Sequence, residues 1–167
     1  CAGFCPAGHT CDAATTTPTP CEPAHFCPEG SAVAQACPQG TFSAAEGLAS
    51  EQQCSTCPAG SSCSIGVLNH SLCSPGQVQA QPGEGACDSC AAGRYQDAPG
   101  QTACFACTTP GTYCLAGASA ALPCPQGRHH NATMAALNLS MTSENDCVEC
   151  PAGAFCRAGA SASTPCA

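Results

Sequence analysis

Pairs of cysteines separated by two residues are the groups in this sequence whose spacing is best suited to chemistry. They are Cys54/Cys57, Cys87/Cys90, Cys104/Cys107 and Cys147/Cys150. Two such pairs hold a zinc ion when they converge, and a single reactive pair in a βαβ setting acts as a redox centre. No βαβ pattern surrounds them here, and each pair lies inside a longer cysteine repeat. We therefore expect disulfides, with no metal and no cofactor other than attached glycans.

Other reactive side chains are dispersed along the chain. His129 and His130 stand next to a glycosylation sequon, and we interpret them as solvated loop residues. The acidic residues form no D-x-D-x-D-G loop for calcium. No nucleophile, base and orienting acid form a recognisable set. We expect the protein not to be an enzyme.

The cysteines belong to a tandem array of two kinds of module that spans residues 1–167. A short module opens with C-x5-C or C-x6-C and reaches the next cysteine after nine more residues, whereas a long module closes after 13, 16 or 22 residues. Modules open at residues 5, 21, 37, 57, 73, 90, 107, 124 and 150. Because Cys166 opens a further module, we expect the chain to be a segment of a longer protein.

A short module that is absent from the array, or repeated in it, changes the number of cysteines by two. This favours a disulfide within each module. The predicted pairs are Cys5–Cys11, Cys21–Cys27, Cys37–Cys54, Cys57–Cys63, Cys73–Cys87, Cys90–Cys104, Cys107–Cys114, Cys124–Cys147 and Cys150–Cys156, with Cys1 and Cys166 bonded outside the segment. A rival scheme joins C-x9-C pairs such as Cys63–Cys73 and C-x2-C pairs such as Cys54–Cys57, with Cys1–Cys5. Spacing alone does not decide between them. We favour the first scheme because the second needs several tight C-x2-C bridges.

The composition predicts a fold held together by these bridges. Leu, Ile, Val and Phe together number 17 of 167 residues and there is no Trp, while Ala and Cys number 32 and 20. So little large apolar surface would predict disorder, but disulfides at roughly 2–3 kcal/mol each can replace a core. We expect a small disulfide-rich repeat array: an elongated rod of short β-ladders and turns, with one helical turn within 134–141. Each C-P-x-G opening predicts a type I turn, and nearby aromatic rings are expected to pack over the disulfides.

Charge and cysteine content limit the compartment and the partners. The formal charge is −8, with three arginines and no lysine, which argues against nucleic acid and against anionic membrane surfaces. No apolar run is long enough to insert into a membrane. Twenty cysteines at regular spacing indicate an oxidising compartment. We therefore expect an extracellular or cell-surface location.

Several sites are candidates for attached sugars. N-glycosylation sequons stand at Asn69, Asn131 and Asn138,, and the last two fall in the longest loop of the array. A Thr/Pro-rich tract is of the kind that carries O-glycans or hydroxyproline; it consists of Thr15, Thr16, Thr17, Pro18, Thr19 and Pro20. An unmodified polyproline-II spacer is the alternative for this tract.

Two stretches of the sequence resemble a known family. Segment 90–107 reads CAAGRYQDAPGQTACFAC and is similar to the ephrin-receptor-like cysteine-rich repeat, C-P-x-G-[TR]-[YF]-x4-G-x3-C-x2-C, with Ala91 in place of the proline. Segment 150–156, CPAGAFC, resembles the extension of this repeat in protist and algal surface proteins. The cysteine-rich repeats are also similar in their general organisation to tumour-necrosis-factor-receptor modules. The resemblance implies an extended, extracellular, disulfide-rich rod but no particular ligand.

These features lead to a structural role as the expected function. We expect a glycosylated segment of an extracellular filament, stalk or mastigoneme-like cell-surface appendage. Its partners would be further copies of itself or other extracellular matrix proteins. The alternative is the stalk of a receptor or adhesion ectodomain, in which the array positions a separate binding domain.

Overall fold

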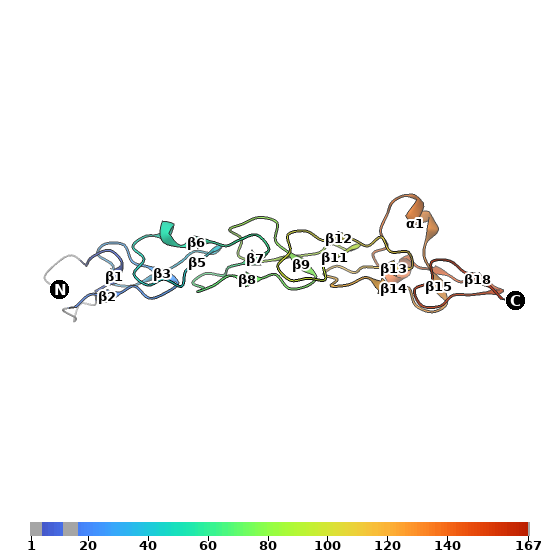
Figure 1. Cartoon of the computed structure of the whole chain (residues 1–167), viewed down its shortest axis with the longest axis horizontal. Coiled ribbons are helices and arrows are strands. Elements are labelled where there is room, and N and C mark those ends of the chain that lie inside the picture. Colours follow the sequence, from blue (N-terminus) through green and yellow to red (C-terminus); the bar gives the residue numbers. More distant parts are fainter. Residues whose placement is uncertain (1–4, 12–16, 167) are drawn as a thin grey trace. The chain divides into compact units, whose positions relative to one another are not determined.

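The structure, a computed structural model, describes residues 5–11 and 17–166 and is built from very short elements (Figure 1). In these ranges it contains nine separate two-stranded antiparallel sheets, each strand being two residues long. The helical elements there are α1 (Ala132–Ala136) and the 3-10 turns η1 (Glu51–Gln53) and η2 (Glu144–Asp146). The predicted small disulfide-rich repeat array of short β-ladders and turns is confirmed.

The chain divides into two compact units. The first comprises Cys1–Cys73 and Gln79–Cys87, and the second Ser74–Val78 and Asp88–Ala167. The hairpins of the first unit are β1 (His9–Thr10) with β2 (Thr19–Pro20), β3 (His25–Phe26) with β4 (Gln35–Ala36), β5 (Thr41–Phe42) with β6 (Ser55–Thr56), and β7 (Ser61–Ser62) with β8 (Ser71–Leu72). Those of the second unit are β9 (Gln77–Val78) with β10 (Asp88–Ser89), β11 (Arg94–Tyr95) with β12 (Phe105–Ala106), β13 (Thr112–Tyr113) with β14 (Leu122–Pro123), β15 (Arg128–His129) with β16 (Val148–Glu149), and β17 (Ala154–Phe155) with β18 (Thr164–Pro165).

Each module opens with a tight turn that feeds its first strand. In the module opened by Cys5, the N–H of His9 donates to the carbonyl of Pro6 at 3.2 Å, and Gly8 lies at the third turn position with a φ of 79°. A positive φ at this position is the mark of a type II turn, so the predicted type I turn is wrong. The proline stands one place earlier in the turn than expected, and the glycine is needed inside the turn. Ala24 takes the same position in the next module at a φ of 63°.

Within each compact unit, main-chain hydrogen bonds recur in the same register from module to module. The N–H of the cysteine that opens a module donates to the carbonyl of the preceding turn glycine, as from Cys124 to Gly111 at 2.7 Å. The N–H of a turn glycine donates to a carbonyl just after the first strand of the next module, as from Gly93 to Cys114 at 2.8 Å. Only backbone groups take part, so these contacts place few demands on the side chains.

Turn glycines also lie against the module after the next one. An added Cβ at Gly111 would collide with the carbonyl oxygen of Gly159 and approach its carbonyl carbon to 2.7 Å. Because both residues also have positive φ, a side chain is excluded here by strain and by contact. The same close approach joins Gly8 to Gly47, Gly40 to Gly83, and Gly76 to Gly117.

Buried apolar side chains form only small clusters beside the disulfides. Phe26 and Leu48 pack with the Cys37–Cys54 bridge. Met141 packs with the Cys124–Cys147 bridge, and Tyr113 and Met134 lie against that cluster. Phe26 and Tyr113 thus lie beside disulfides as predicted. The ring of Phe155 does not follow the rule, since it is 44% exposed with Arg157 above its face.

A pair of glycine substitutions separates backbone strain from packing. Gly111 and Gly127 both lie in the second compact unit with φ of 81° and 86°, but an added Cβ at Gly127 meets nothing within 4 Å. We expect Gly127→Ala to cost roughly 1–2 kcal/mol from the left-handed backbone alone. Gly111→Ala should cost about 1–3 kcal/mol more because it also overpacks the contact with Gly159. The free energy of unfolding with disulfides intact checks this, and equal losses for the two variants would contradict it.

Candidate functional site

The cysteines of the described residues form nine disulfides, one in each module, with Cα–Cα distances of 5.7–6.0 Å. The structure brings together the pairs Cys5–Cys11, Cys21–Cys27, Cys37–Cys54, Cys57–Cys63, Cys73–Cys87, Cys90–Cys104, Cys107–Cys114, Cys124–Cys147 and Cys150–Cys156. These are the pairs of the within-module scheme. The two members of each C-x2-C pair belong to different bridges, so they do not form the tight bridges of the rival scheme.

The two cysteines assigned to bonds outside the segment are placed differently. Cys1 lies outside the described residues. Cys166 is exposed and has no disulfide partner among the described residues. Its N–H donates to the carbonyl of Gly153 at 2.9 Å, as the N–H of Cys124 does to Gly111 and that of Cys150 to Gly127. Cys166 therefore occupies the position of an opening cysteine.

The disulfides require an oxidising environment for the fold to be stable. Many bridges in one short chain indicate an oxidising, extracellular or secretory environment. In the ranges 5–11 and 17–166, no group of three or more His, Cys, Asp or Glu side chains is arranged to hold a metal ion. Among the helices that the structure describes, none has the length and hydropathy to cross a membrane.

Long modules replace the second cysteine of short modules with a buried polar side chain. Gln96 is 1% exposed; its Nε2 donates to the carbonyl of Ala103 at 2.7 Å, and its Oε1 accepts from the N–H of Ala98 at 3.1 Å. Gln79 makes the equivalent bonds in the preceding module, and Ser43 is also buried. The burial of these residues was not predicted from the sequence. Their position, six after an opening cysteine, is the signal that could have found them.

The longest loop carries a capped helix whose two ends are sequon asparagines. Asn131 is the N-cap of α1, and its Oδ1 accepts from the N–H groups of Thr133 and Met134 at 3.1 and 3.3 Å,. Asn138 follows the C-cap with a φ of 54°, and its N–H donates to Ala135 while that of Leu139 donates to Met134. This is a Schellman motif, in which asparagine is the usual substitute for glycine. The predicted helical turn is present but begins earlier, at residue 132, because Asn131 caps it.

The two adjacent histidines are not the solvated loop residues that we expected. His129 lies in β15, both rings are half-buried, and the Nδ1 of His129 lies 2.8 Å from the carbonyl oxygen of His130. The Nδ1 of His130 is buried without a hydrogen-bond partner among the described residues. His129 is placed by the pairing of β15 with β16, next to the Cys124–Cys147 bridge. His130 stands six residues after Cys124, the position that Gln96 occupies in its module.

The carboxylate of Asp146 stabilises the end of the same loop through hydrogen bonds. Asp146 accepts hydrogen bonds from the N–H groups of Thr142 and Ser143 at 2.7 and 3.0 Å, and from the Thr142 hydroxyl. These bonds, above all the one from the Thr142 backbone, favour the ionised form and hold the pKa of Asp146 below its usual range,. The carboxylate is therefore charged at neutral pH and anchors the chain just before Cys147.

The remaining modification sites lie at the surface. Asn69 is exposed, in the loop that leads to β8, and Asn138 is exposed whereas Asn131 is half-buried. In the Thr/Pro-rich tract, Thr15 and Thr16 lie outside the described residues. Thr17, Pro18, Thr19 and Pro20 are exposed, and the last two form strand β2. At least that end of the tract is a paired strand and not a free polyproline spacer.

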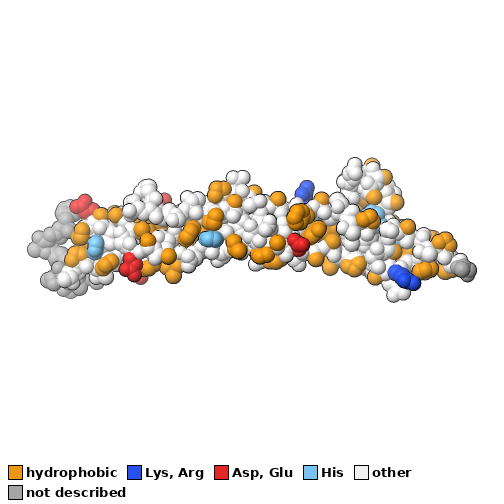
Figure 2. All heavy atoms as spheres, viewed as in Figure 1, with side chains coloured by type: hydrophobic (Ala, Val, Ile, Leu, Met, Phe, Trp, Pro, Cys, Tyr) orange, Lys and Arg blue, Asp and Glu red, His pale blue; other side chains and the backbone are white. Residues whose placement is uncertain are grey.

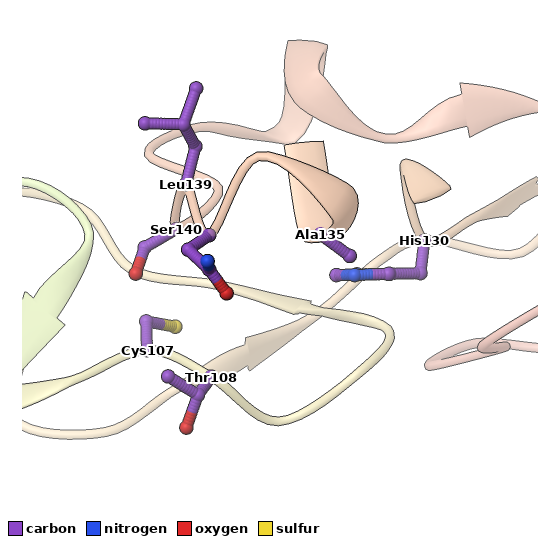
Figure 3. A pocket seen from close by; sticks show the side chains of 7 residues that line it. Cys107, Thr108, His130, Ala135, Leu139 and Ser140 are labelled. Carbon is purple, nitrogen blue, oxygen red and sulfur yellow. The ribbon is translucent and has the colours of Figure 1, made fainter. Parts of the chain in front are cut away.

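A surface cavity of about 200 Å³ lies between the longest loop and the start of the module opened by Cys107 (Figure 3). Cys107 and Thr108 line it from that module, and Ala135 and Ser140 line it from the loop. His130, whose Nδ1 is buried without a partner among the described residues, also lines it, and the lining contains no Asp, Glu, Lys or Arg of the described residues. The cavity therefore suits a polar group without a formal charge, which an imidazole nitrogen can hydrogen-bond. Charged side chains are few and scattered on the face of the molecule drawn in Figure 2.

No protein-family model matches this chain, and no curated protein matches it.

Disulfide mapping by proteolysis and mass spectrometry, without reduction, tests the pairing. We expect peptides cross-linked as Cys90–Cys104 and Cys107–Cys114, and a mass about 2 Da lower for each bridge than in the reduced chain. A cross-link between Cys104 and Cys107 would show that the C-x2-C scheme holds in solution.

Substitution of a buried glutamine tests the part played by the polar residue in long modules. Gln96→Met keeps the side-chain length but leaves the Ala98 N–H and the Ala103 carbonyl unpaired, so we expect a loss of about 2 kcal/mol. Gln101→Met is the control, because Gln101 is exposed and should change stability by no more than about 0.5 kcal/mol. Denaturant unfolding with disulfides intact measures both. A neutral Gln96→Met variant would refute a stabilising part for these bonds.

Proposed function

We propose that this protein is an extracellular structural protein: a glycosylated segment of a filament, stalk or cell-surface appendage. The observation that carries the proposal is the recurrence of the same backbone hydrogen bonds from one module to the next. A contact made by backbone groups can be repeated any number of times without matched side chains. An array of this kind is suited to spanning a distance.

The distribution of side chains supports the same role. Among the described residues, buried positions are occupied mainly by cysteines, with a few glutamine and serine side chains and Ala24, Phe26, Leu48 and Met141 beside them. The bridges hold each module, so the outward-facing side chains have little part in stability. Such a surface tolerates attached sugars, which are bulky and solubilising, at exposed sites such as Asn69 and Asn138.

The proposal includes a relationship to ephrin-receptor-like cysteine-rich repeats. Its support is the module that carried the resemblance, in which Gly93 opens hairpin β11/β12 and the Cys90–Cys104 bridge closes it. The aromatic position of the motif, Tyr95, pairs with Phe105, the ring centroids being 5.9 Å apart.

Small-angle scattering of the secreted, oxidised protein tests the spacer role. A compact chain of this length would have a radius of gyration of about 15 Å, and we expect a clearly larger value with a thin, constant cross-section. The reduced and alkylated chain is the control and should approach the roughly 40 Å of an unfolded chain. A value near 15 Å for the oxidised protein would exclude a spacer.

Localisation in the organism that makes the protein separates the two structural roles. Antibodies against the array should label thin extracellular fibres or appendages along their length if the chain builds a filament. Label restricted to a cell membrane, on a chain that continues into a membrane span and a separate binding domain, would contradict the filament and favour a receptor stalk.

A further inference from the structure

The cavity beside Cys107 marks the place where a recurring contact is missing. In other modules a loop glycine donates its N–H to the carbonyl of the preceding opening cysteine, as from Gly117 to Cys90 at 2.7 Å and from Gly159 to Cys124 at 2.8 Å. By this pattern the donor to the Cys107 carbonyl would come from the following module, which carries the 22-residue loop. No described residue donates to that carbonyl. The cavity lies at this position.

The loop residues that bound the cavity pack against other modules, although the bond to the Cys107 carbonyl is missing. Ser140 packs against the module opened by Cys90, since its Cβ lies 3.0 Å from where a Cβ on Gly93 would stand. The carbonyl of the next residue, Met141, accepts from the N–H of Cys114 at 3.1 Å. The Schellman motif at Asn138 fixes the other side,. The space is therefore bounded by ordered backbone and does not simply collapse.

The N-glycosylation sequon Asn138-Leu139-Ser140 is itself part of the cavity lining. Asn138 is exposed and its side chain makes no hydrogen bond within the described residues, unlike Asn131, whose Oδ1 caps α1. The Asn138 amide is therefore accessible at the wall of the cavity.

We propose that Asn138 carries an N-glycan whose first N-acetylglucosamine sits in this cavity, against Ala135 and Thr108, and orders the loop. The inference rests on the proposed extracellular role, because N-glycans are added in the secretory pathway. In the attachment, the Asn138 amide nitrogen bonds to C1 of the sugar and loses a proton, and the lipid diphosphate of the oligosaccharide donor leaves.

The size and charge of the cavity fit a single neutral sugar. Its volume of about 200 Å³ is smaller than the roughly 300–1,000 Å³ of pockets that enclose drug-sized ligands, so it suits one ring and not an oligosaccharide. The covalent tether holds that ring at a high effective concentration, so even weak contacts suffice to keep it in place.

The test uses the full chain secreted from a glycosylating host and trimmed enzymatically to one N-acetylglucosamine per asparagine. Ser140→Ala removes the sequon but keeps the Cβ that packs near Gly93, and Ser140→Thr retains the sequon. Ser71→Ala, a substitution in β8 that removes the sequon of Asn69, is the matched control. We expect amide hydrogen exchange at 137–139 to be about threefold faster or more in Ser140→Ala, and unchanged in the other two variants.

A second measurement on the unmutated protein does not depend on any variant folding correctly. In its NMR spectrum, the acetyl methyl of the sugar on Asn138 should show nuclear Overhauser contacts with the methyls of Ala135 and Thr108. A glycosylated Asn138 without these contacts, or with exchange unaffected by Ser140→Ala, overturns the inference. An unmodified Asn138 in protein secreted with all nine disulfides intact also overturns it, but leaves the proposed structural role standing.

Discussion

One disulfide in each module is the constraint on which the rest of this structure depends. The strands are two residues long, far too short to be stable alone, and the apolar clusters hold only a few side chains each. Closing loops of 6 to 23 residues removes conformational freedom that a hydrophobic core would otherwise have to offset. In long modules the bridge closes the loop between the two strands of the hairpin, as Cys90–Cys104 does for β11 and β12. In short modules it closes the turn and the first strand, as Cys57–Cys63 does for β7, and thereby fixes one side of the ladder.

The bridges explain the modules, and backbone hydrogen bonds explain how modules are joined. Each turn glycine serves both purposes: it adopts the positive φ that the turn needs, and it brings a carbonyl and an N–H to neighbouring modules. A side chain at Gly111 would block the approach of Gly159. The longest loop does not provide the bond to the Cys107 carbonyl, and a cavity lies there.

The sequence predicts the features that depend on local spacing, and it does so because cysteine and glycine have narrow structural uses. The repeat and the short hairpins follow from spacing alone. The turn type was wrong because proline suits more than one turn position. Gln79 and Gln96 were missed because an isolated glutamine is usually a surface residue, and its burial becomes evident only when the modules are aligned on their turns. The placement of His129 depends on the β15/β16 pairing, which spans the longest loop, and His130 was missed for the same reason as Gln96, since it stands six residues after its opening cysteine.

The central claim is that covalent links within modules take the place of a core. Amide hydrogen exchange before and after complete reduction, in the absence of denaturant, tests it most directly. The account predicts that the N–H groups of the opening cysteines, such as Cys90 and Cys124, are protected in the oxidised protein and lose that protection altogether once the bridges are reduced. Protection that persists in the fully reduced chain would show that something other than the disulfides holds the modules together.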